Sequence, residues 1–311
     1  MPTIAPEPAP PPGPREAHQA REVAESFGTD PERHDRARPG YPAALVQRII
    51  AAISGPGPGP GPGPGPGGPG SPGPGSPGPG SPGGPRVLDV GCGTGIAARQ
   101  FQAAGAGVLG VEPDPRMAAF ARRSGVETEV ATFEEWEPAD REFGAVIAAT
   151  AWHWVDPVAG AAKAAGVLRP GGLLAVFWNA FEPPAGLREA FGEIYRRVLR
   201  DSPFFQSAMP GIDRYARAMC GKAADGIRQA GGFGGTGQWR FDWERPYTRD
   251  EWLDQVPTSG GHSRLSPGRQ QELLAGIGEA VDAAGGSFTM RYATVAVTAV
   301  RSGPADRSGA G

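Results

Sequence analysis

The chain is poor in the residues that build covalent or metal-held scaffolds, and it lacks a long apolar run. Only two of its 311 residues are cysteines, Cys92 and Cys220, which is too few for a disulfide framework or a four-cysteine zinc site. Its longest clearly apolar run, 173–178, is far shorter than the roughly 20 residues that span a bilayer. Residues 1–14 are proline-rich and lack the basic-then-apolar order of a signal peptide. We therefore expect a cytoplasmic protein in a reducing compartment.

A strong charge of either sign is missing as well. The formal net charge is −3 and the sequence pI is about 5.9. A chain with this charge balance has no broad basic surface. Binding to nucleic acids depends mainly on such a surface, because its basic side chains neutralise the backbone phosphates. We therefore expect neither nucleic acid nor a membrane as a partner. The spacing of His, Cys and Asp also shows no metal-ligand pattern, so we expect no metal.

One internal tract has no side chain able to build a core. Residues 55–85 are all glycine, proline or serine, and glycine does not recur at every third position as collagen requires. Without apolar side chains, nothing offsets the entropy lost on ordering, so we predict a disordered linker. Disordered tails are expected at 1–20 and 302–311. The foldable parts would then be a helical cap at 21–54, a core at 86–180 and a continuation of the same domain at 181–301.

After the tract, short apolar runs alternate with amphipathic stretches. Continuous apolar runs of this length are typical of parallel strands that are buried on both faces. We therefore predict an α/β fold of the Rossmann-like, doubly wound type, with a mostly parallel sheet, an antiparallel final strand and helices on both faces. The predicted strands are 86–90, 108–111, 126–130, 145–149, 173–177 and 288–300, with an aromatic segment at 239–243; the predicted helices are 21–27, 42–53, 96–104, 115–123, 157–168, two between 182 and 238, and 267–284, with a turn at 169–172.

The most informative motif follows the first predicted strand. Asp89-Val90 runs into Gly91-Cys92-Gly93-Thr94-Gly95 and then into a helix. In doubly wound sheets, ligands bind beyond the carboxyl ends of the strands, and glycines there allow the backbone to approach the ligand. The spacing G-x-G-x-G differs from the G-x-G-x-x-G of dinucleotide sites. The acidic Asp89 beside it disfavours a pyrophosphate and favours a cationic ligand.

Three later strand ends add matching features. Glu112 ends the second strand, where a carboxylate can accept hydrogen bonds from ribose hydroxyls. Thr132 and Phe133 follow the third strand and offer a backbone amide and an apolar ring to an adenine. The segment 148–154 ends the fourth strand and would form the cleft floor.

These motifs, in this order, resemble the class I S-adenosylmethionine-dependent methyltransferases. The residues that carry the resemblance are VLDVGCGTG at 87–95, VLGVEPDPRM at 108–117, FGAVIAATAWHWVD at 143–156 and VLRPGGLLAVFWN at 167–179. The segment 34–42 resembles that of a small-molecule subgroup similar to the trans-aconitate and ubiquinone/menaquinone methyltransferases. The resemblance covers about 25–54 and 86–301, and the Gly-Pro tract departs from the family pattern.

The resemblance implies S-adenosylmethionine as the cofactor and gives roles to particular residues. Asp89 and the backbone of the loop would hold the methionine part, and Glu112 the ribose hydroxyls. Arg38 and Tyr41 would close over the methionine end. Pro113, Thr132 and Phe133 would border the adenine, and Thr150 and Ala151 would face the sulfonium. The full implied cofactor set is Arg38, Tyr41, Asp89, Gly91, Cys92, Gly93, Thr94, Gly95, Glu112, Pro113, Thr132, Phe133, Thr150 and Ala151. Within this set we interpret Cys92 as a small loop filler.

Methyl transfer from a sulfonium needs mainly positioning and exclusion of water, and a base only where the acceptor carries a proton. His153 is the histidine best placed to be that base, because the others lie in the tail, near the start or in a Gly/Ser loop. Its two tryptophan neighbours favour a packing role instead. The aromatic side chains that are candidates for an acceptor pocket are Trp152, Trp154, Trp178 and Phe204.

The predicted function is methylation of a small molecule on oxygen, carbon or a carboxyl group. An NAD-dependent oxidoreductase would need a glycine where Ile96 stands. A non-catalytic S-adenosylmethionine-binding protein has the same loop, so it stays open. Methylation of RNA or protein is a third alternative. The segment 149–152 lacks the N-P-P-Y type of tetrad used for amine attack on nucleobases.

Overall fold

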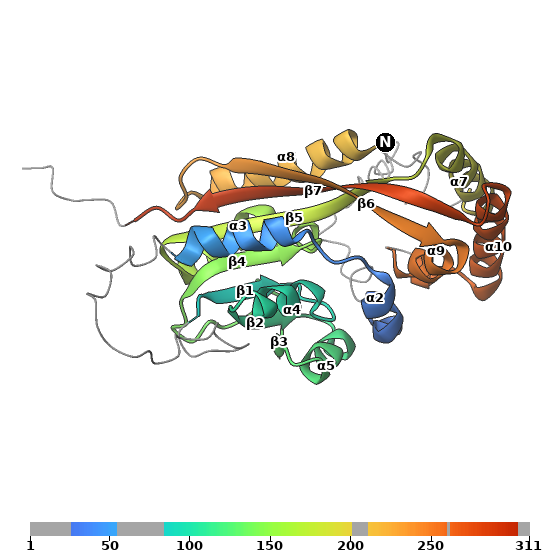
Figure 1. Cartoon of the computed structure of the whole chain (residues 1–311). Coiled ribbons are helices and arrows are strands. Elements are labelled where there is room, and N and C mark those ends of the chain that lie inside the picture. Colours follow the sequence, from blue (N-terminus) through green and yellow to red (C-terminus); the bar gives the residue numbers. More distant parts are fainter. Residues whose placement is uncertain (1–25, 55–83, 201–210, 260–261, 304–311) are drawn as a thin grey trace, which may run out of the picture.

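The computed structural model describes residues 26–54, 84–200, 211–259 and 262–303 (Figure 1). The tail at 1–20, nearly all of the tract at 55–85 and most of the tail at 302–311 lie outside these residues, as does Phe204. Those expectations stay predictions.

A seven-stranded sheet runs through the described part of the chain, in the order β3-β2-β1-β4-β5-β7-β6. Strands β1 to β5 pair in parallel, whereas β7 is antiparallel to both β5 and β6. The strand order reverses between β1 and β4, so the predicted doubly wound, mostly parallel sheet is confirmed. The strands are β1 (Arg86–Val90), β2 (Gly107–Glu112), β3 (Glu127–Val130), β4 (Phe143–Ala149), β5 (Leu168–Glu182), β6 (Gly237–Thr248) and β7 (Ser287–Val300).

Helices cover both faces of the parallel part. On one face, α3 and α4 pack against Val87 and Ile147, and on the other, α6 and α8 pack against Leu88 and Val146. Adjacent strand residues thus point into different cores, which is why these strands are apolar throughout. The α-helices are α2 (Pro31–Ala37), α3 (Ala43–Ser54), α4 (Ile96–Ala103), α5 (Pro115–Arg123), α6 (Pro157–Val167), α7 (Ala185–Val198), α8 (Ile212–Ala230), α9 (Arg249–Gln255) and α10 (Pro267–Ala283).

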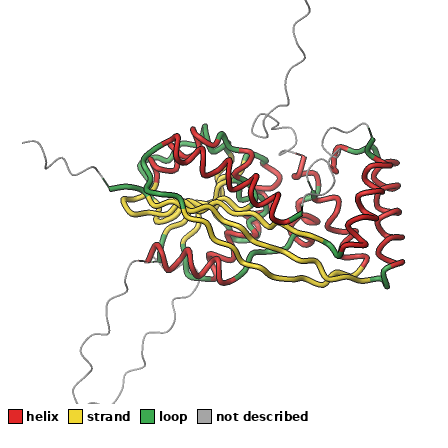
Figure 2. Tube along the Cα trace, turned by 90° about the horizontal axis from the view of Figure 1, so that it is seen from above, coloured by secondary structure: helices red, strands yellow, loops and turns green. Residues whose placement is uncertain are grey.

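The last three strands in the sheet extend it beyond its parallel part. Strands β5, β6 and β7 continue as a long ribbon that carries α7, α9 and α10 at its far end (Figures 1 and 2). These helices share an aromatic core with the ribbon, in which Phe191, Trp252 and Phe288 contact one another. Residues 179–181 of β5 and Tyr292 of β7 line a cavity at the carboxyl ends of the parallel strands.

The structure corrects several predicted boundaries. Residues 169–172 belong to β5 and form a bulge opposite Gly144 in place of the predicted free turn, because Phe143 pairs with Leu168 and Ala145 with Leu173. The aromatic segment 239–243 is part of the longer strand β6, and α2 and α9 were not predicted. Residues Ser26–Thr29 form a 3-10 helix at the end of the predicted helix 21–27. Among the described residues, no helix is both long and apolar enough to cross a bilayer.

Candidate functional site

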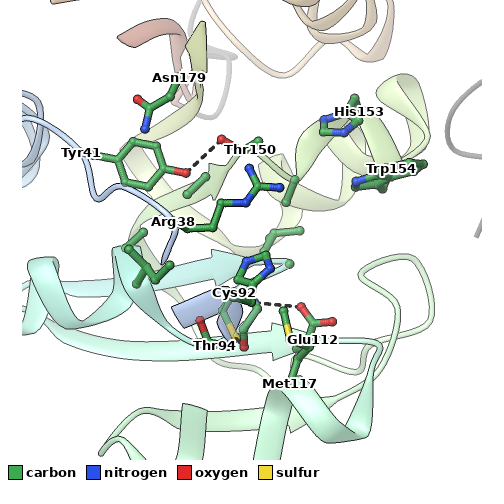
Figure 3. Close-up of a pocket in the computed structure, with 18 of the residues that line it drawn as sticks. Arg38, Tyr41, Cys92, Thr94, Glu112, Met117, Thr150, His153, Trp154 and Asn179 are labelled. Carbon is green, nitrogen blue, oxygen red and sulfur yellow. Dashed lines mark hydrogen bonds between the residues drawn. The ribbon is translucent and has the colours of Figure 1, made fainter. Parts of the chain in front are cut away.

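A cavity of about 460 Å³ lies at the carboxyl ends of the parallel strands (Figure 3). Its walls come from the loop after β1, the ends of β2, β4 and β5, the segment after α2, and residues of α8 and β7. This is the switch point of the sheet, where doubly wound folds bind ligands. Of the sequence-derived site residues, those on its wall are Arg38, Tyr41, Gly91, Cys92, Gly93, Thr94, Glu112, Pro113, Thr132, Phe133, Thr150, Ala151, His153 and Trp154.

The glycine loop needs its glycines for conformational reasons. Gly91, Gly93 and Gly95 have φ of 65°, 57° and 87°, a region that side chains disfavour. A Cβ on Gly91 would also lie 2.6 Å from the Cβ of Ala151. Gly93 lies on the cavity wall, whereas Gly95 lies off it and precedes the first residue of α4. The loop thus turns sharply beneath the cavity with its backbone facing the open space.

Asp89 lies beneath this loop and not on the cavity wall, which corrects the expected direct contact with a ligand. It is fully buried, and neither carboxylate oxygen has a hydrogen-bond partner. Burial, and after it the nearby Glu112 carboxylate, raises its pKa to about 8 against a smaller opposing effect of the Ala98 amide. A buried, unsatisfied carboxyl is costly, and a cation above the loop would offset that cost.

Glu112 reaches the wall from the end of β2. One carboxylate oxygen accepts from the amide of Gly93 at 2.9 Å, and the other accepts from the amide of Asp114 at 3.0 Å. Burial raises the pKa of Glu112 to about 7. The two amides fix the orientation of the carboxylate and leave each oxygen a further lone pair for a ligand hydroxyl.

Tyr41 and Thr150 meet at the base of the cavity. The Tyr41 hydroxyl and Thr150 Oγ1 are 2.9 Å apart, and Tyr41 packs edge-on against Phe177. Thr150 has a φ of 56°, which is strained for a β-branched residue, and its amide donates to the Phe177 carbonyl at 2.7 Å. Strain of this kind concentrates at functional sites. Burial raises the pKa of Tyr41 to about 12, so its hydroxyl stays protonated at neutral pH.

His153 lines the cavity from the 3-10 helix Trp152–Trp154. Its Nδ1 accepts a hydrogen bond from the indole Nε1 of Trp178 at 3.2 Å. Burial, and secondarily the Arg38 charge, lowers its pKa to about 4. The neutral ring therefore carries its proton on Nε2 and presents a donor to the cavity.

Two of the predicted acceptor-pocket residues lie in the core. Trp152 packs among Gly160 and Phe133 beside α6, and Trp178 sits behind His153; neither is on the cavity wall. Trp178 belongs to β5, in which successive residues point to opposite faces of the sheet, and Trp152 turns toward the core from the 3-10 helix that follows β4. Several wall residues were not predicted, because no local sequence pattern marks a side chain that reaches the cavity through tertiary packing. They are His34, Met117, Asn179, Phe181, Tyr215, Gln255, Ser259 and Tyr292.

Ion pairs hold the segment around α2 over the cavity. Arg33 and Arg36 both bind the carboxylate of Asp254 on α9, at 3.0 Å and 2.9 Å. Arg99 of α4 binds Asp35 at 2.6 Å. The segment therefore joins the parallel core to the ribbon layer and closes one side of the cavity.

Comparison with known proteins identifies the core. Residues 88–176 match a family described as a methyltransferase domain. The region from β1 into β5 is therefore similar to a methyltransferase domain. A proposed type II methyltransferase from Anaeromyxobacter dehalogenans has a similar fold, with a TM-score of 0.52 and 21% identity over 85% of this chain and 97% of the other.

Curated relatives match the same domain. An uncharacterized methyltransferase of Mycobacterium tuberculosis is 31% identical over 179 residues, which are 57% of this chain and 61% of the relative. A ubiquinone biosynthesis O-methyltransferase of Bradyrhizobium sp. is 36% identical over 110 residues, 32% of this chain and 43% of the other. The match to the methyltransferase of M. tuberculosis thus spans about three fifths of that relative's length.

Proposed function

We propose that this methyltransferase domain transfers the methyl group of S-adenosylmethionine to a small-molecule acceptor. The observation that carries the proposal is the pairing of two buried carboxyls at the ends of β1 and β2, Asp89 with no partner and Glu112 held by two amides. A dinucleotide pyrophosphate would place negative charge against both groups. A cationic sulfonium and ammonium, joined to a ribose, match them.

The rest of the cavity fits such a ligand. Its volume of about 460 Å³ lies in the range of small-molecule and cofactor sites. Pro113, Thr132 and Phe133 form an apolar and amide-bearing wall beyond Glu112, suited to an adenine. The turn at Gly91 and Gly93, both at positive φ, presents its backbone to the cavity where the amino-acid part would lie.

Bound S-adenosylmethionine would supply a methyl group on a positively charged sulfur. The acceptor atom takes the methyl group in line, and the sulfur leaves as a neutral thioether. The chain's own residues bind, orient and exclude water. Glu112 accepts the ribose hydroxyls, and the Tyr41–Thr150 pair fixes the floor on which the reacting centre rests. His153 offers its Nε2–H to the methyl acceptor, because its Nδ1 already accepts a hydrogen bond from the Trp178 indole. Holding both reactants close and dry provides most of the rate gain in such a transfer.

Isothermal titration calorimetry tests the proposal with S-adenosylhomocysteine and NAD as probes. We expect S-adenosylhomocysteine to bind at one site and NAD not to bind. Glu112→Ala should weaken S-adenosylhomocysteine binding by about 1–3 kcal/mol through lost charge-assisted hydrogen bonds. The matched control is Glu127→Ala, which removes an exposed carboxylate at the start of β3. Tight NAD binding, or equal affinities of both variants, would overturn the proposal.

A further inference from the structure

We propose that two copies of this chain associate through strand β6, in an antiparallel arrangement that sets Arg240 of each copy opposite Asp242 of the other. The inference concerns an interaction surface and is independent of the proposed cofactor and reaction. It starts from the edges of the sheet, because an outermost strand presents backbone groups that another strand can bind.

The two edges of the sheet differ in length and charge. Strand β3 spans four residues, Glu127–Val130, and carries two glutamates. Strand β6 spans 12 residues, pairs with β7 along its whole length and, in the part of the chain that the structure describes, has no strand on its outer side. Natural proteins block edges with short strands, charges of one sign or proline. The β3 edge has the first two of these features, whereas β6 has only Pro246, near its end.

The even-numbered residues of β6 turn their backbone groups toward this open edge. In an antiparallel pair, residues that bond to the neighbouring strand alternate with residues whose backbone groups face away. The amide of Arg249, directly after β6, continues the ladder and donates to the carbonyl of Gly286 at 2.9 Å, so the odd-numbered residues bond to β7. Pro246, which has no N–H, belongs to the other set, as expected. The rest of that set is Gln238, Arg240, Asp242 and Glu244.

The side chains of this outward set are exposed and self-complementary in one register. When two copies of β6 pair about Phe241, Arg240 faces Asp242 of the second copy, and the symmetry of the pair repeats this contact. Opposite charges on facing residues stabilise a strand pair, and like charges destabilise it. Centring the pair on Arg240 or on Asp242 sets that residue against its own copy. Centring it on 243 sets Asp242 against Glu244.

The other face of β6 is complementary in the same register. Trp239, Phe241 and Trp243 are half-buried, and the first two pack at the margin of the core below α3. About Phe241, the two copies of Phe241 face each other, and Trp239 faces Trp243 of the second copy. These are non-hydrogen-bonded pairs, in which the side chains come closest. Aromatic cross-strand pairs stabilise a sheet, so a second copy of this chain is the occupant that fits both faces.

This surface is connected to the cavity wall by one side chain. Trp243 stacks on Tyr292, with ring centroids 4.2 Å apart, and its Nε1 donates to Thr294 Oγ1 at 2.9 Å. Thr294 Oγ1 in turn donates to Asn179 Oδ1 at 2.7 Å. Tyr292 and Asn179 both line the cavity. Association covers Trp243 and thereby supports this part of the wall from outside.

Sedimentation velocity of the full chain, over a dilution series, tests the dimer. The monomer has a mass of 32.1 kDa, and we expect the wild type to sediment at twice that mass. Arg240→Asp sets carboxylates opposite each other and Asp242→Arg sets guanidiniums opposite each other, so each variant alone should be a monomer. An equimolar mixture of the two restores opposite charges at both positions and should sediment as a dimer. The control Glu127→Arg reverses a charge on the β3 edge and should stay dimeric.

Circular dichroism shows whether each variant is folded before it is compared. A wild type that sediments at 32.1 kDa throughout the series overturns the inference, whether the edge then stays open or binds a different protein. A mixture of folded variants that stays monomeric, or a single variant that dimerises as the wild type does, also overturns it.

Cysteine cross-linking tests the register without reversing a charge. Position 241 faces its own copy in a pair whose Cα atoms lie about 4.5 Å apart, within reach of a disulfide. Position 238 lies six residues along the strand from its copy, about 20 Å. On mild oxidation we expect Phe241→Cys to form a disulfide-linked dimer and Gln238→Cys to form none above the wild type, whose Cys92 and Cys220 are buried. Equal cross-linking of the two variants, or none of either, overturns the proposed pairing.

Discussion

Trp178 donates its indole N–H to Nδ1 of His153 across 3.2 Å. This single contact fixes the tautomer of the one cavity histidine that the sequence suggested as a base. A neutral His153 with its proton on Nε2 can donate to an acceptor molecule, but it has no lone pair facing the cavity with which to remove a proton. We therefore expect His153 to orient the acceptor and not to act as a base.

The protonation state of His153 is directly measurable. Because its pKa is lowered to about 4, we expect long-range 1H–15N spectra to show the neutral Nε2–H form throughout about pH 5.5 to 8.5, and Trp178→Phe to relax this tautomer preference. His153→Gln assigns the resonance. A protonation midpoint near the ordinary histidine value of about 6.5 would contradict the prediction.

Cofactor affinity should depend on pH through the two buried carboxyls. Free Asp89 and Glu112 have pKa values raised to about 8 and about 7. The ammonium of S-adenosylhomocysteine favours the ionised form of Asp89, and its ribose hydroxyls favour the ionised form of Glu112. Binding then lowers both pKa values and releases protons. We expect the affinity for S-adenosylhomocysteine to increase from about pH 6 to about pH 8 and then level off. Calorimetry in buffers of different ionisation enthalpy measures the protons released, and uptake of protons would refute this linkage.

Asp89 should also lower the stability of the ligand-free protein at higher pH. Its folded-state pKa of about 8 exceeds the ordinary value of 3.8, so the folded protein binds more protons than the unfolded chain between these values. Stability is therefore lost as the pH rises through that window. We expect Asp89→Asn to raise Tm at pH 8 and to change it little near pH 4, with each kcal/mol worth roughly 2–4 °C. Its affinity for S-adenosylhomocysteine should fall. An equal Tm change at both pH values would show that the carboxyl charge is not the cause.

The loop glycine Gly91 has a matched control elsewhere in the chain. Gly91→Ala places a Cβ 2.6 Å from that of Ala151 at a φ of 65°, whereas Gly125→Ala has a φ of 87° and nothing within 4 Å. Both variants lose about 1–2 kcal/mol of unfolding free energy through the backbone conformation. We expect Gly91→Ala to lose a further 1–3 kcal/mol or so through overpacking, and to bind S-adenosylhomocysteine more weakly. Denaturant unfolding of both variants checks this, and equal losses would contradict it.

Much of the fold could be predicted because the parallel strands are buried on both faces. The run Val87–Val90 is apolar apart from Asp89. In the helices that follow, apolar residues recur every three to four positions, so the sequence distinguishes these helices from the strands. The helix at Pro115–Arg123 was predicted at its true bounds, since proline begins it and Asp114 caps it. The bulge at 169–172 was not predicted, because a Pro-Gly-Gly sequence signals a turn whether or not the strand continues beyond it.

The cofactor side of the site was more predictable than the acceptor side. Gly91, Glu112 and Thr150 each follow a strand in the parallel sheet, and strand ends meet at one edge. Tyr215 and Tyr292 reach the cavity from α8 and the antiparallel β7, and only the packing of the ribbon onto the core brings them there. Trp152 illustrates the reverse error, since an aromatic residue at a strand end can equally face the core.

The most direct test of the account is a crystal structure of the chain with S-adenosylhomocysteine. The account predicts ribose hydroxyls on the Glu112 carboxylate, the sulfur beside Thr150 and Ala151, and the amino-acid part over the turn at Gly91–Gly95. A ligand bound outside this cavity, or one whose ribose lies away from Glu112, would contradict it.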